Sequence, residues 1–364
     1  MRILRNYILK EFFHAFFLSI IVFTFVLLVG NIIKLADLVI NKGVDILSVL
    51  KLFFYLIPWL LSFTLPIAVL TGVILTFGRF SSDGELTAMK ASGVSLFRAS
   101  FPLIMLGIVC SFGSFFLNDQ VSPNASFASR RVVKEIGMRK PTAYLEEATF
   151  IRGLENYVIF IYEIRGNKLK NIRIYQPQEG KPTRTIVAES GEINTLPEKN
   201  MIELKLFNGT SEEPSPTDPE TFYKLNFKTY NMTIDLSTIM KKETIQKKTR
   251  EMTIKELNKE IEKSIVQKID PAPLYVEIYK KINMSAASFV LILIGIPLGI
   301  KAHRSEKSIG FGISLLLFAV YWGLFLGGIA LALKGTVSAF WGVSLGNILF
   351  LMLGIVLFSN TARR

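Results

Sequence analysis

The stretch Leu52–Gly78, LFFYLIPWLLSFTLPIAVLTGVILTFG, contains 27 consecutive residues without one charged side chain. A helix that crosses the hydrocarbon core of a bilayer needs about 20 apolar residues, so this stretch is long enough to span a membrane. No water in that core can hydrate an open backbone, and only a helix or a closed barrel satisfies its own peptide groups there. The stretch therefore predicts a transmembrane helix.

Five further runs have the same character. Each contains at least 19 residues without Lys, Arg, Asp or Glu, and six such runs cannot all lie in the core of one soluble domain. The mean hydropathy of +0.41 over 364 residues is likewise too high for an ordinary soluble protein. The sequence thus predicts six membrane spans. The five further runs are 12–33, 99–117, 282–300, 308–333 and 335–362.

Basic residues gather at alternate ends of these runs and predict the orientation. Eleven lie on one side, in the two termini and in the loops after the second and fourth runs. The opposite short loops hold four lysines, and Asp37 and Asp45 offset part of their positive charge. By the positive-inside rule both termini are cytoplasmic, and the long segment between the third and fourth runs lies outside. The eleven residues are Arg2, Arg5, Lys10, Arg79, Lys90, Arg98, Lys301, Arg304, Lys307, Arg363 and Arg364.

The net charge of +13 does not indicate nucleic acid. Residues 119–277 carry 25 basic and 23 acidic side chains, so most of the excess belongs to the membrane-spanning parts, where topology explains it. The single cysteine, Cys110, excludes a disulfide framework and a cysteine-based zinc site. Inside a span, an inert packing role for Cys110 is favoured over a nucleophile.

The polar segment 119–276 changes from helical to strand-like patterning. Tyr157–Tyr162 is a continuous run of β-branched and aromatic residues, and Tyr223, Leu225 and Phe227 alternate with polar neighbours. Turn residues separate the runs, which fits an antiparallel sandwich or open barrel. Helical patterning returns in Thr253–Ile265. The predicted fold class is therefore an α-helical polytopic membrane protein, 3+3, with an inserted all-β extracytoplasmic domain.

The predicted organisation has three parts. Residues 1–118 hold spans 1–3, residues 119–276 hold the β domain with its helical connector at about 253–265, and residues 277–364 hold spans 4–6. Three G-x-x-x-G pairs predict close helix contacts, either within the chain or between chains. They are Gly295/Gly299, Gly323/Gly327 and Gly342/Gly346.

No motif for catalysis is present. The chain has no G-x-x-x-x-G-K-[ST] phosphate loop, so we do not expect it to hydrolyse ATP itself. It also lacks H-E-x-x-H, G-x-S-x-G and paired cysteines, and we expect no bound metal.

The loop between spans 2 and 3, Arg79–Gly93, carries helix signals. Ser82 followed three residues later by Glu85 has the pattern of a capping box, and Gly93 suits a helix stop, so a short helix is expected at about 82–92. One interpretation is a connector that rests on the headgroups, in which Glu85 only caps. The other is a docking helix that receives force from a cytoplasmic motor.

Lys34 lies where span 1 meets the outer leaflet of the membrane that the helix crosses. A snorkelling lysine is one interpretation, and a contact with an anionic lipid headgroup is the other. Lys42 in the same loop is a weaker candidate for the same contact.

Short motifs distributed along nearly the whole chain carry a resemblance to a known family. Together with the 3+3 layout, their order resembles the LptF/LptG (YjgP/YjgQ) permeases of the lipopolysaccharide export system. The motifs are Leu65–Ala68, Phe77–Glu85, Ala91–Ser95, Asn118–Pro123, Ile186–Gly191, Leu204–Gly209 and Gly295–Gly299, with Arg304 and Gly310.

The resemblance implies a fold and an assembly. Family members lie in the inner membrane of the cell. They have six transmembrane helices and a β-jellyroll domain in the periplasm. Two permease chains pair and recruit two copies of a cytoplasmic ABC ATPase, which binds the ATP and Mg²⁺, so this chain needs no cofactor. The pair extracts lipopolysaccharide from the inner membrane and passes it to a periplasmic bridge protein of similar β fold.

The resemblance also implies site residues. Glu85 matches the carboxylate that couples to the ATPase, and we expect Arg79, Ser82 and Lys90 to belong to the same contact. Lys34, supported by Lys42, matches the basic position that meets lipid phosphates. The acyl chains are expected on the apolar interior of the β domain, for which an ordinary sandwich core is the alternative. The interior candidates are Phe150, Ile159, Leu204, Leu206, Tyr223 and Phe227.

Two other classes of function compete with export. One is an extracytoplasmic sensor or envelope-assembly scaffold without transport, which predicts a chain that purifies without an ATPase. The other is a membrane enzyme that acts on lipid, against which the absence of a buried acid/base cluster in the spans weighs.

Overall fold

The structure is a computed structural model that describes residues 2–139, 148–154, 157–178, 181–196, 201–214, 222–235, 246–301 and 307–363. By its internal contacts the chain divides into two compact units. A helical unit comprises Met1–Asn31, Phe54–Phe127 and Lys247–Arg364, and a second unit comprises Ile32–Phe53 and Ala128–Gln246.

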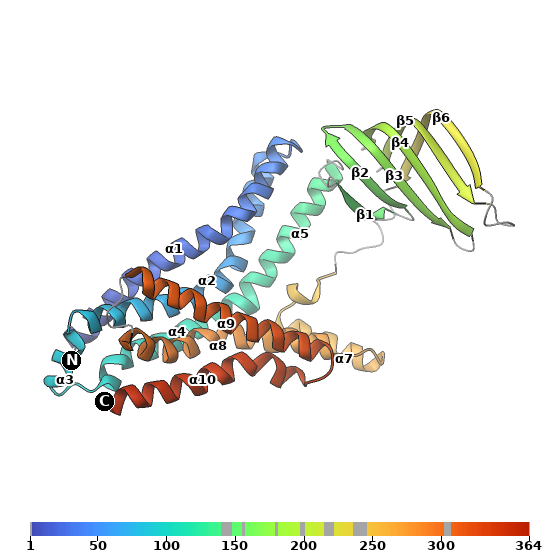
Figure 1. Ribbon diagram of the computed structural model, residues 1–364. Coiled ribbons are helices and arrows are strands. Elements are labelled where there is room, and N and C mark those ends of the chain that lie inside the picture. The colour runs from blue at the N-terminus through green and yellow to red at the C-terminus, as the bar shows by residue number, and fades with distance from the viewer. Residues whose placement is uncertain are drawn as a thin grey trace. The chain divides into compact units, whose positions relative to one another are not determined.

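Among the residues that the structure describes, six helices are long and apolar enough to cross a membrane, as the sequence predicted. The short α3 follows the second span, a π-helical turn over Leu117–Val121 joins α4 to α5, and α7 precedes the fourth span (Figure 1). The helices are α1 (Arg2–Ile40), α2 (Ile46–Ser82), α3 (Glu85–Ala91), α4 (Leu96–Phe116), α5 (Ser122–Arg139), α7 (Ile254–Val266), α8 (Ala272–Lys301), α9 (Lys307–Leu333) and α10 (Ala339–Arg363).

Helices α2 and α8 form the centre of the helical unit. More than two thirds of the most apolar part of each is buried, whereas α1 and α9 expose most of theirs. Phe77 and Ile292 lie in one apolar cluster with residues of α1 and α4, and Leu70 and Leu291 lie in another with residues of α9 and α10. The central pair therefore joins the first three spans to the last three.

Glycines allow the backbones of α2 and α8 to approach closely. A Cβ atom at Gly299 would lie 2.9 Å from the carbonyl oxygen of Ile74 and 3.0 Å from Cβ of Phe77. A Cβ at Gly295 would contact Val73 at 3.2 Å. This pair confirms that a predicted G-x-x-x-G motif marks helix contact within the chain. By contrast, nothing in the described structure lies within 4 Å of a Cβ at Gly323 or Gly327.

A hydrogen-bond network joins buried polar side chains of α8, α9 and α10. Asn347 Nδ2 donates to Asn283 Oδ1 at 2.9 Å, and the Tyr321 hydroxyl donates to Asn347 Oδ1 at 3.0 Å. Asn283 Nδ2 in turn donates to the Ser344 hydroxyl at 3.0 Å. A buried polar group without a partner is costly, so this network fixes the register of α8, α9 and α10.

The β strands of the second unit form one antiparallel sheet in which neighbours follow chain order. The sheet confirms the predicted β insertion between spans 3 and 4. The α1–α2 turn belongs to the same unit, and there Val44, Val49 and Leu52 pack with Ile136 of α5. The strands are β1 (Thr149–Leu154), β2 (Tyr157–Arg165), β3 (Lys168–Gln178), β4 (Lys181–Leu196), β5 (Met201–Pro214) and β6 (Phe222–Asp235).

The inward-facing positions shift by one residue partway along each long strand. On β4 the buried positions are Ile186 and Ala188 before the shift and Gly191 and Ile193 after it. Neighbouring strands shift at the paired positions: Ala188 pairs with Gly209, and Gly191 pairs with Leu206. Because all strands change together, the sheet encloses one apolar core, with Ile159, Ile161, Ile172, Ile174, Leu204 and Leu206 almost fully buried.

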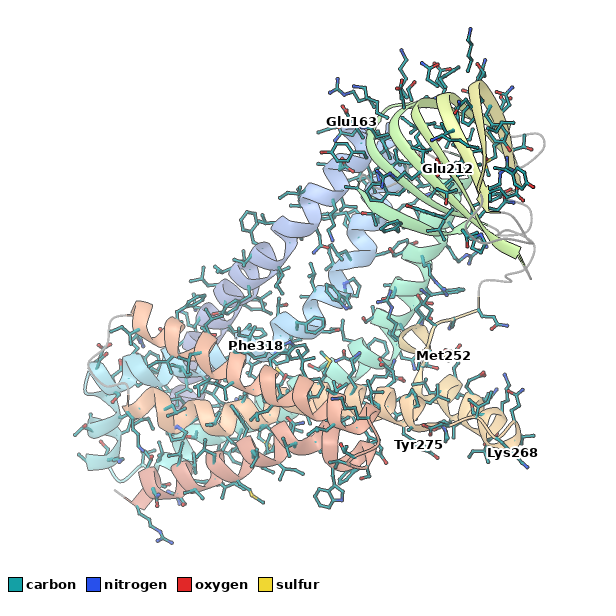
Figure 2. The ribbon with its side chains drawn as sticks, turned by 45° about the vertical axis from the view of Figure 1, so that its right-hand side comes forward. Glu163, Glu212, Met252, Lys268, Tyr275 and Phe318 are labelled. Atoms are coloured by element: carbon teal, nitrogen blue, oxygen red, sulfur yellow. The ribbon has the colours of Figure 1, made fainter. Side chains whose placement is uncertain are left out.

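The opposite face of the sheet carries charged pairs between neighbouring strands. Glu163 and Glu212, both labelled in Figure 2, lie on β2 and β5. Lys170 Nζ lies 3.5 Å from Glu163 Oε2, and Lys224 Nζ lies 3.0 Å from Glu212 Oε1. A cross-strand ion pair of this exposure adds little stability and identifies a solvated face.

The α2–α8 contact yields a stability prediction. Gly299→Ala forces a methyl group against the Ile74 carbonyl, and overpacking of this kind costs about 1–3 kcal/mol. Gly323→Ala is the matched control, because both substitutions gain the same helix propensity and only Gly299 lacks space. The midpoint of thermal unfolding of the full chain in detergent should fall for Gly299→Ala relative to Gly323→Ala. Equal midpoints would contradict the close approach of α2 and α8.

Candidate functional site

A polar cluster centred on Arg79 joins α1, α2 and α3 at one end of the helical unit. Arg79 Nη2 donates to the Tyr7 hydroxyl at 2.7 Å, and the hydroxyl donates to Glu85 Oε1 at 2.9 Å. Arg79 Nε also lies 3.2 Å from Glu11 Oε1, and Arg79 Nη2 lies 3.7 Å from Glu85 Oε1. One guanidinium thus holds two carboxylates and one phenol.

Aromatic rings hold the guanidinium in place. The Arg79 guanidinium carbon lies 5.3 Å from the ring centre of Phe80 and 5.7 Å from that of Tyr7. The Tyr7 and Phe80 rings stack at 5.5 Å. A single half-exposed ion pair contributes little, but a network with stacked rings restricts the positions of all three helices.

The ends of the chain and α3 lie at the same end of the helical unit (Figure 1). Ser81 of α2 donates to the Ile300 carbonyl of α8 at 2.9 Å, and Phe97 of α4 contacts Phe358 of α10 with ring centres 6.4 Å apart. The helix ends that the charge distribution assigned to one side of the membrane are therefore neighbours.

The start of α3 differs from the prediction. The capping box at Ser82 is wrong, because α2 continues through Ser82 and the Ser82 hydroxyl donates to the Arg79 carbonyl at 3.0 Å. The chain then turns at Gly84, which has φ of 72°, and α3 starts at Glu85 rather than near 82. Glu85 consequently sits in the first helical turn, where the helix dipole favours a carboxylate.

The end of α3 confirms the predicted stop at Gly93. The Gly93 N–H donates to the Lys90 carbonyl at 2.9 Å, and the Val94 N–H donates to the Met89 carbonyl at 2.9 Å. This is a Schellman motif, and glycine accommodates its φ of 78°. Lys90 itself is exposed. Of the four predicted coupling residues, the structure brings Arg79 and Glu85 together, while Ser82 and Lys90 lie outside their network.

The two predicted headgroup lysines differ in their surroundings. Lys34 is exposed on α1, and no carboxylate of the described residues lies within ion-pair distance of it. Lys42 Nζ lies 3.9 Å from Asp37 Oδ2, so its charge is partly balanced. Lys34 is therefore the stronger of the two candidates for an anionic ligand.

The interior candidates of the β unit fall into two groups. Ile159, Leu204 and Leu206 are at most 2% exposed and form the core, and the half-buried Phe227 packs against it. Tyr223 and its neighbour Leu225 precede Phe227 on the same face of β6 but are 68% and 58% exposed. The apolar face is thus closed in its middle and open at the start of β6.

The placement of Phe150 on that interior face is wrong. Phe150 pairs with Phe160, and Ile151 pairs with the buried Ile159, so Phe150 lies on the other face of the sheet. Its ring lies 4.9 Å from that of Phe160 and the side chain is 54% exposed. A nearby cavity of about 780 Å³ includes Phe160 and Phe227 in its lining.

A second buried charge cluster, which the sequence interpretation missed, lies at the π-helical turn. Asp119 Oδ1 accepts a hydrogen bond from the Ile254 N–H at 2.7 Å, and Lys281 Nζ lies 3.9 Å from the same oxygen. Lys281 Nζ also donates to the Asn118 carbonyl at 3.1 Å. The cluster joins the chain leaving α4 to the chain returning through α7 and α8. Two charges beside the ends of uncharged runs are the signal that could have identified the pair.

The capped start of α7 supports this junction. Helix α7 confirms the helix predicted over Thr253–Ile265, and Thr253 caps it: its hydroxyl accepts from the Glu256 N–H, and the Glu256 carboxylate accepts from the Thr253 N–H at 2.8 Å. Desolvation would raise the pKa of Glu256, but hydrogen bonds from Lys247 and from the Thr253 backbone hold it below its usual range.

The buried pair yields a second prediction. Asp119→Asn keeps an acceptor for the Ile254 N–H but removes the nearest counter-charge of the buried Lys281, which costs about 3–5 kcal/mol. The unfolding midpoint of the full chain should fall by on the order of 5 °C or more. Glu262→Gln, the same type of change at an exposed position of α7, should leave it unchanged. An unchanged midpoint for Asp119→Asn would show that the pair carries no stability.

Two comparisons with known proteins agree. A family model described as "Lipopolysaccharide export system permease LptF/LptG" matches residues 6–360. The chain is 21% identical over 218 residues to the lipopolysaccharide export system permease protein LptF of Escherichia coli strain K12 and equally to that of Shigella flexneri. The aligned part covers 58% of this chain and 58% of each relative, so it spans little more than half of their length.

Proposed function

Since this chain belongs to the LptF/LptG family of lipopolysaccharide export system permeases, we propose that it is a transmembrane subunit of an ATP-driven lipid exporter. The substrate is lipopolysaccharide, taken from the inner membrane and passed to a periplasmic bridge protein. The chain spans the inner membrane six times, with both termini cytoplasmic and the β domain in the periplasm. The basic helix ends support this orientation.

The observation that carries the proposal is the Arg79 network. Arg79 ties Glu85 at the start of α3 to Tyr7 and Glu11 on span 1, and Arg79 itself ends span 2. A surface helix held in this way passes a displacement to two spans rather than moving alone. Glu85 remains partly exposed, so its carboxylate can contact a cation of a partner. This supports a docking helix over a simple connector.

The assembly around the chain follows from that role. A second LptF/LptG-type permease pairs with this chain, and two copies of a cytoplasmic ABC ATPase bind the α3 ends. ATP and Mg²⁺ are held by the ATPase, consistent with the lack of a phosphate-binding loop in this sequence. The bridge protein, of similar β fold, receives the lipid from the β domain.

The lipid has two kinds of contact in this proposal. Lys34, exposed and without a described counter-ion, binds a headgroup phosphate. The acyl chains are received by the apolar face of the sheet at its open end, where Tyr223 and Leu225 are exposed beside Phe227. Ile159, Leu204 and Leu206 form the closed core behind this end rather than direct contacts.

A sensor or envelope-assembly scaffold is the alternative function. It requires neither a coupled motor nor lipid on the β domain, so two experiments separate it from export.

The first experiment tests the coupling contact. Glu85→Arg reverses the charge beside Arg79 and breaks the bond from Tyr7, so ATPase binding and transport should fall at least tenfold. Asp83→Arg makes the same charge change two residues away and should retain both activities. The readouts are co-purification of the ATPase and lipid release from proteoliposomes. Wild-type binding and transport by Glu85→Arg would remove the docking role.

The second experiment tests the acyl-chain contact. A photoreactive phenylalanine analogue at Tyr223 should crosslink lipopolysaccharide in the intact complex when ATP is supplied. The same analogue at Thr229, which is exposed on the other face of β6, should not. Crosslinks to protein alone from Tyr223, or equal lipid crosslinking from both positions, would favour the scaffold.

A further inference from the structure

A small basic cavity lies between the first turns of α1 and α4, and none of its lining residues belongs to the Arg79 network. Arg2 and Arg5 of α1 and Arg98 of α4 line it, and its volume is about 180 Å³. Pockets for drug-sized ligands are about 300–1,000 Å³, so this one suits a headgroup and not a whole lipid.

The three guanidinium groups have no acidic partner among the residues that the structure describes. Arg5 contacts the neighbouring Asn6 side chain at 3.4 Å, and no ion pair joins Arg2 or Arg98 to a described carboxylate. Neither helix has an acidic residue in its first turn. A helix N-terminus already carries partial positive charge, so arginines in two adjoining first turns raise the local potential further. This arrangement favours a bound anion.

The rest of the lining is apolar. Ile8, Val94 and Pro102 contribute to the wall, and Ile8 and Val94 belong to the main apolar cluster of the helical unit. Phe101 extends from the lining to the surface, where Phe97 and Phe101 are 55% and 46% exposed. A free inorganic anion would gain nothing from these surfaces, whereas an amphiphile would cover them.

The cavity also lies at headgroup depth. Arg98 directly precedes the uncharged run that starts at Ala99, and Arg5 lies seven residues, about 10 Å of helix, before the run that starts at Phe12. Basic pockets between helices at this depth suit lipid phosphates. Arginine is the side chain best matched to a phosphate, because its fork binds two oxygens at once.

We propose that this cavity binds the phosphate of an anionic phospholipid, with Arg5 and Arg98 on the phosphate oxygens and the acyl chains along Phe97 and Phe101. Such a lipid anchors the start of span 1 to the start of span 3, next to the Arg79 network. The site differs from the Lys34 contact, which lies at the other end of α1. It requires only a membrane-embedded chain and is independent of lipid export.

The test uses the full-length protein in zwitterionic detergent, with bound phosphatidylglycerol counted by native mass spectrometry. Arg5→Gln and Arg98→Gln should each raise the apparent Kd about fivefold, and the double variant about twenty-five-fold. Lys10→Gln, an exposed residue of α1 outside the cavity, should bind as the wild type does. Phosphatidylcholine should bind equally weakly to all of them.

Further arms keep the test decisive. Arg98→Lys retains the charge and should lose less affinity than Arg98→Gln, which a general folding defect would not reproduce. Glu85→Arg should keep full phosphatidylglycerol binding, so failure of the motor contact and failure of this site are distinguishable.

Three results would overturn the proposal. The first is equal phosphatidylglycerol affinity of the double variant and the wild type. The second is complete displacement of the lipid by millimolar inorganic phosphate, which would assign the cavity to a free anion. The third is loss of the co-purifying ATPase from the double variant while its phosphatidylglycerol affinity stays unchanged. This result would assign the cavity to a protein contact.

Discussion

The hydrocarbon core of a bilayer contains no water, and this constraint organises the whole helical unit. Backbone groups must be paired within helices, and charged side chains are confined to helix ends or to buried pairs. The uncharged Leu52–Gly78 run and the Asn283–Tyr321–Asn347 hydrogen bonds are two consequences of the same rule. Because α2 and α8 touch through Gly299, a motion of one span cannot leave the other unaffected.

Charged side chains excluded from the hydrocarbon core form two clusters that connect separate helices. At one end of the helical unit, Arg79 collects Tyr7, Glu11 and Glu85 and so joins a surface helix to spans 1 and 2. At the π-helical turn, Asp119 and Lys281 connect the segment that follows α4, before the β strands, to α7 and α8, after the β strands. In the proposed exporter the first cluster receives the motion of the ATPase, and the second keeps the two chain crossings in register.

Patterns with a strong local period could be predicted from the sequence. The six spans, the helix over Thr253–Ile265 and the stop at Gly93 each depend on residues close together in sequence, and the structure confirms them. The Ser82 cap failed because α2 continued beyond its apolar run, a tertiary effect that a four-residue motif does not contain. The predicted interior placement of Phe150 was wrong because the face on which a strand residue lies depends on how β1 pairs with Ile159 and Phe160 of β2. The partners of Arg79 were missed because Tyr7 and Glu11 lie about 70 residues away in sequence.

The proposed export function requires α3 and the β strands to be exposed on opposite sides of one membrane, because the proposed ATPase and the proposed lipid acceptor lie on different sides of it. Thiol labelling tests this most directly. In a Cys110→Ser background, Thr229→Cys on the sheet and Ser92→Cys after α3 both place a thiol at an exposed position. A membrane-impermeant maleimide added to cells with a permeabilised outer membrane should label the Thr229→Cys variant, and label the Ser92→Cys variant only after lysis. Labelling of the Ser92→Cys variant in intact cells, with the Thr229→Cys variant protected, would contradict the account.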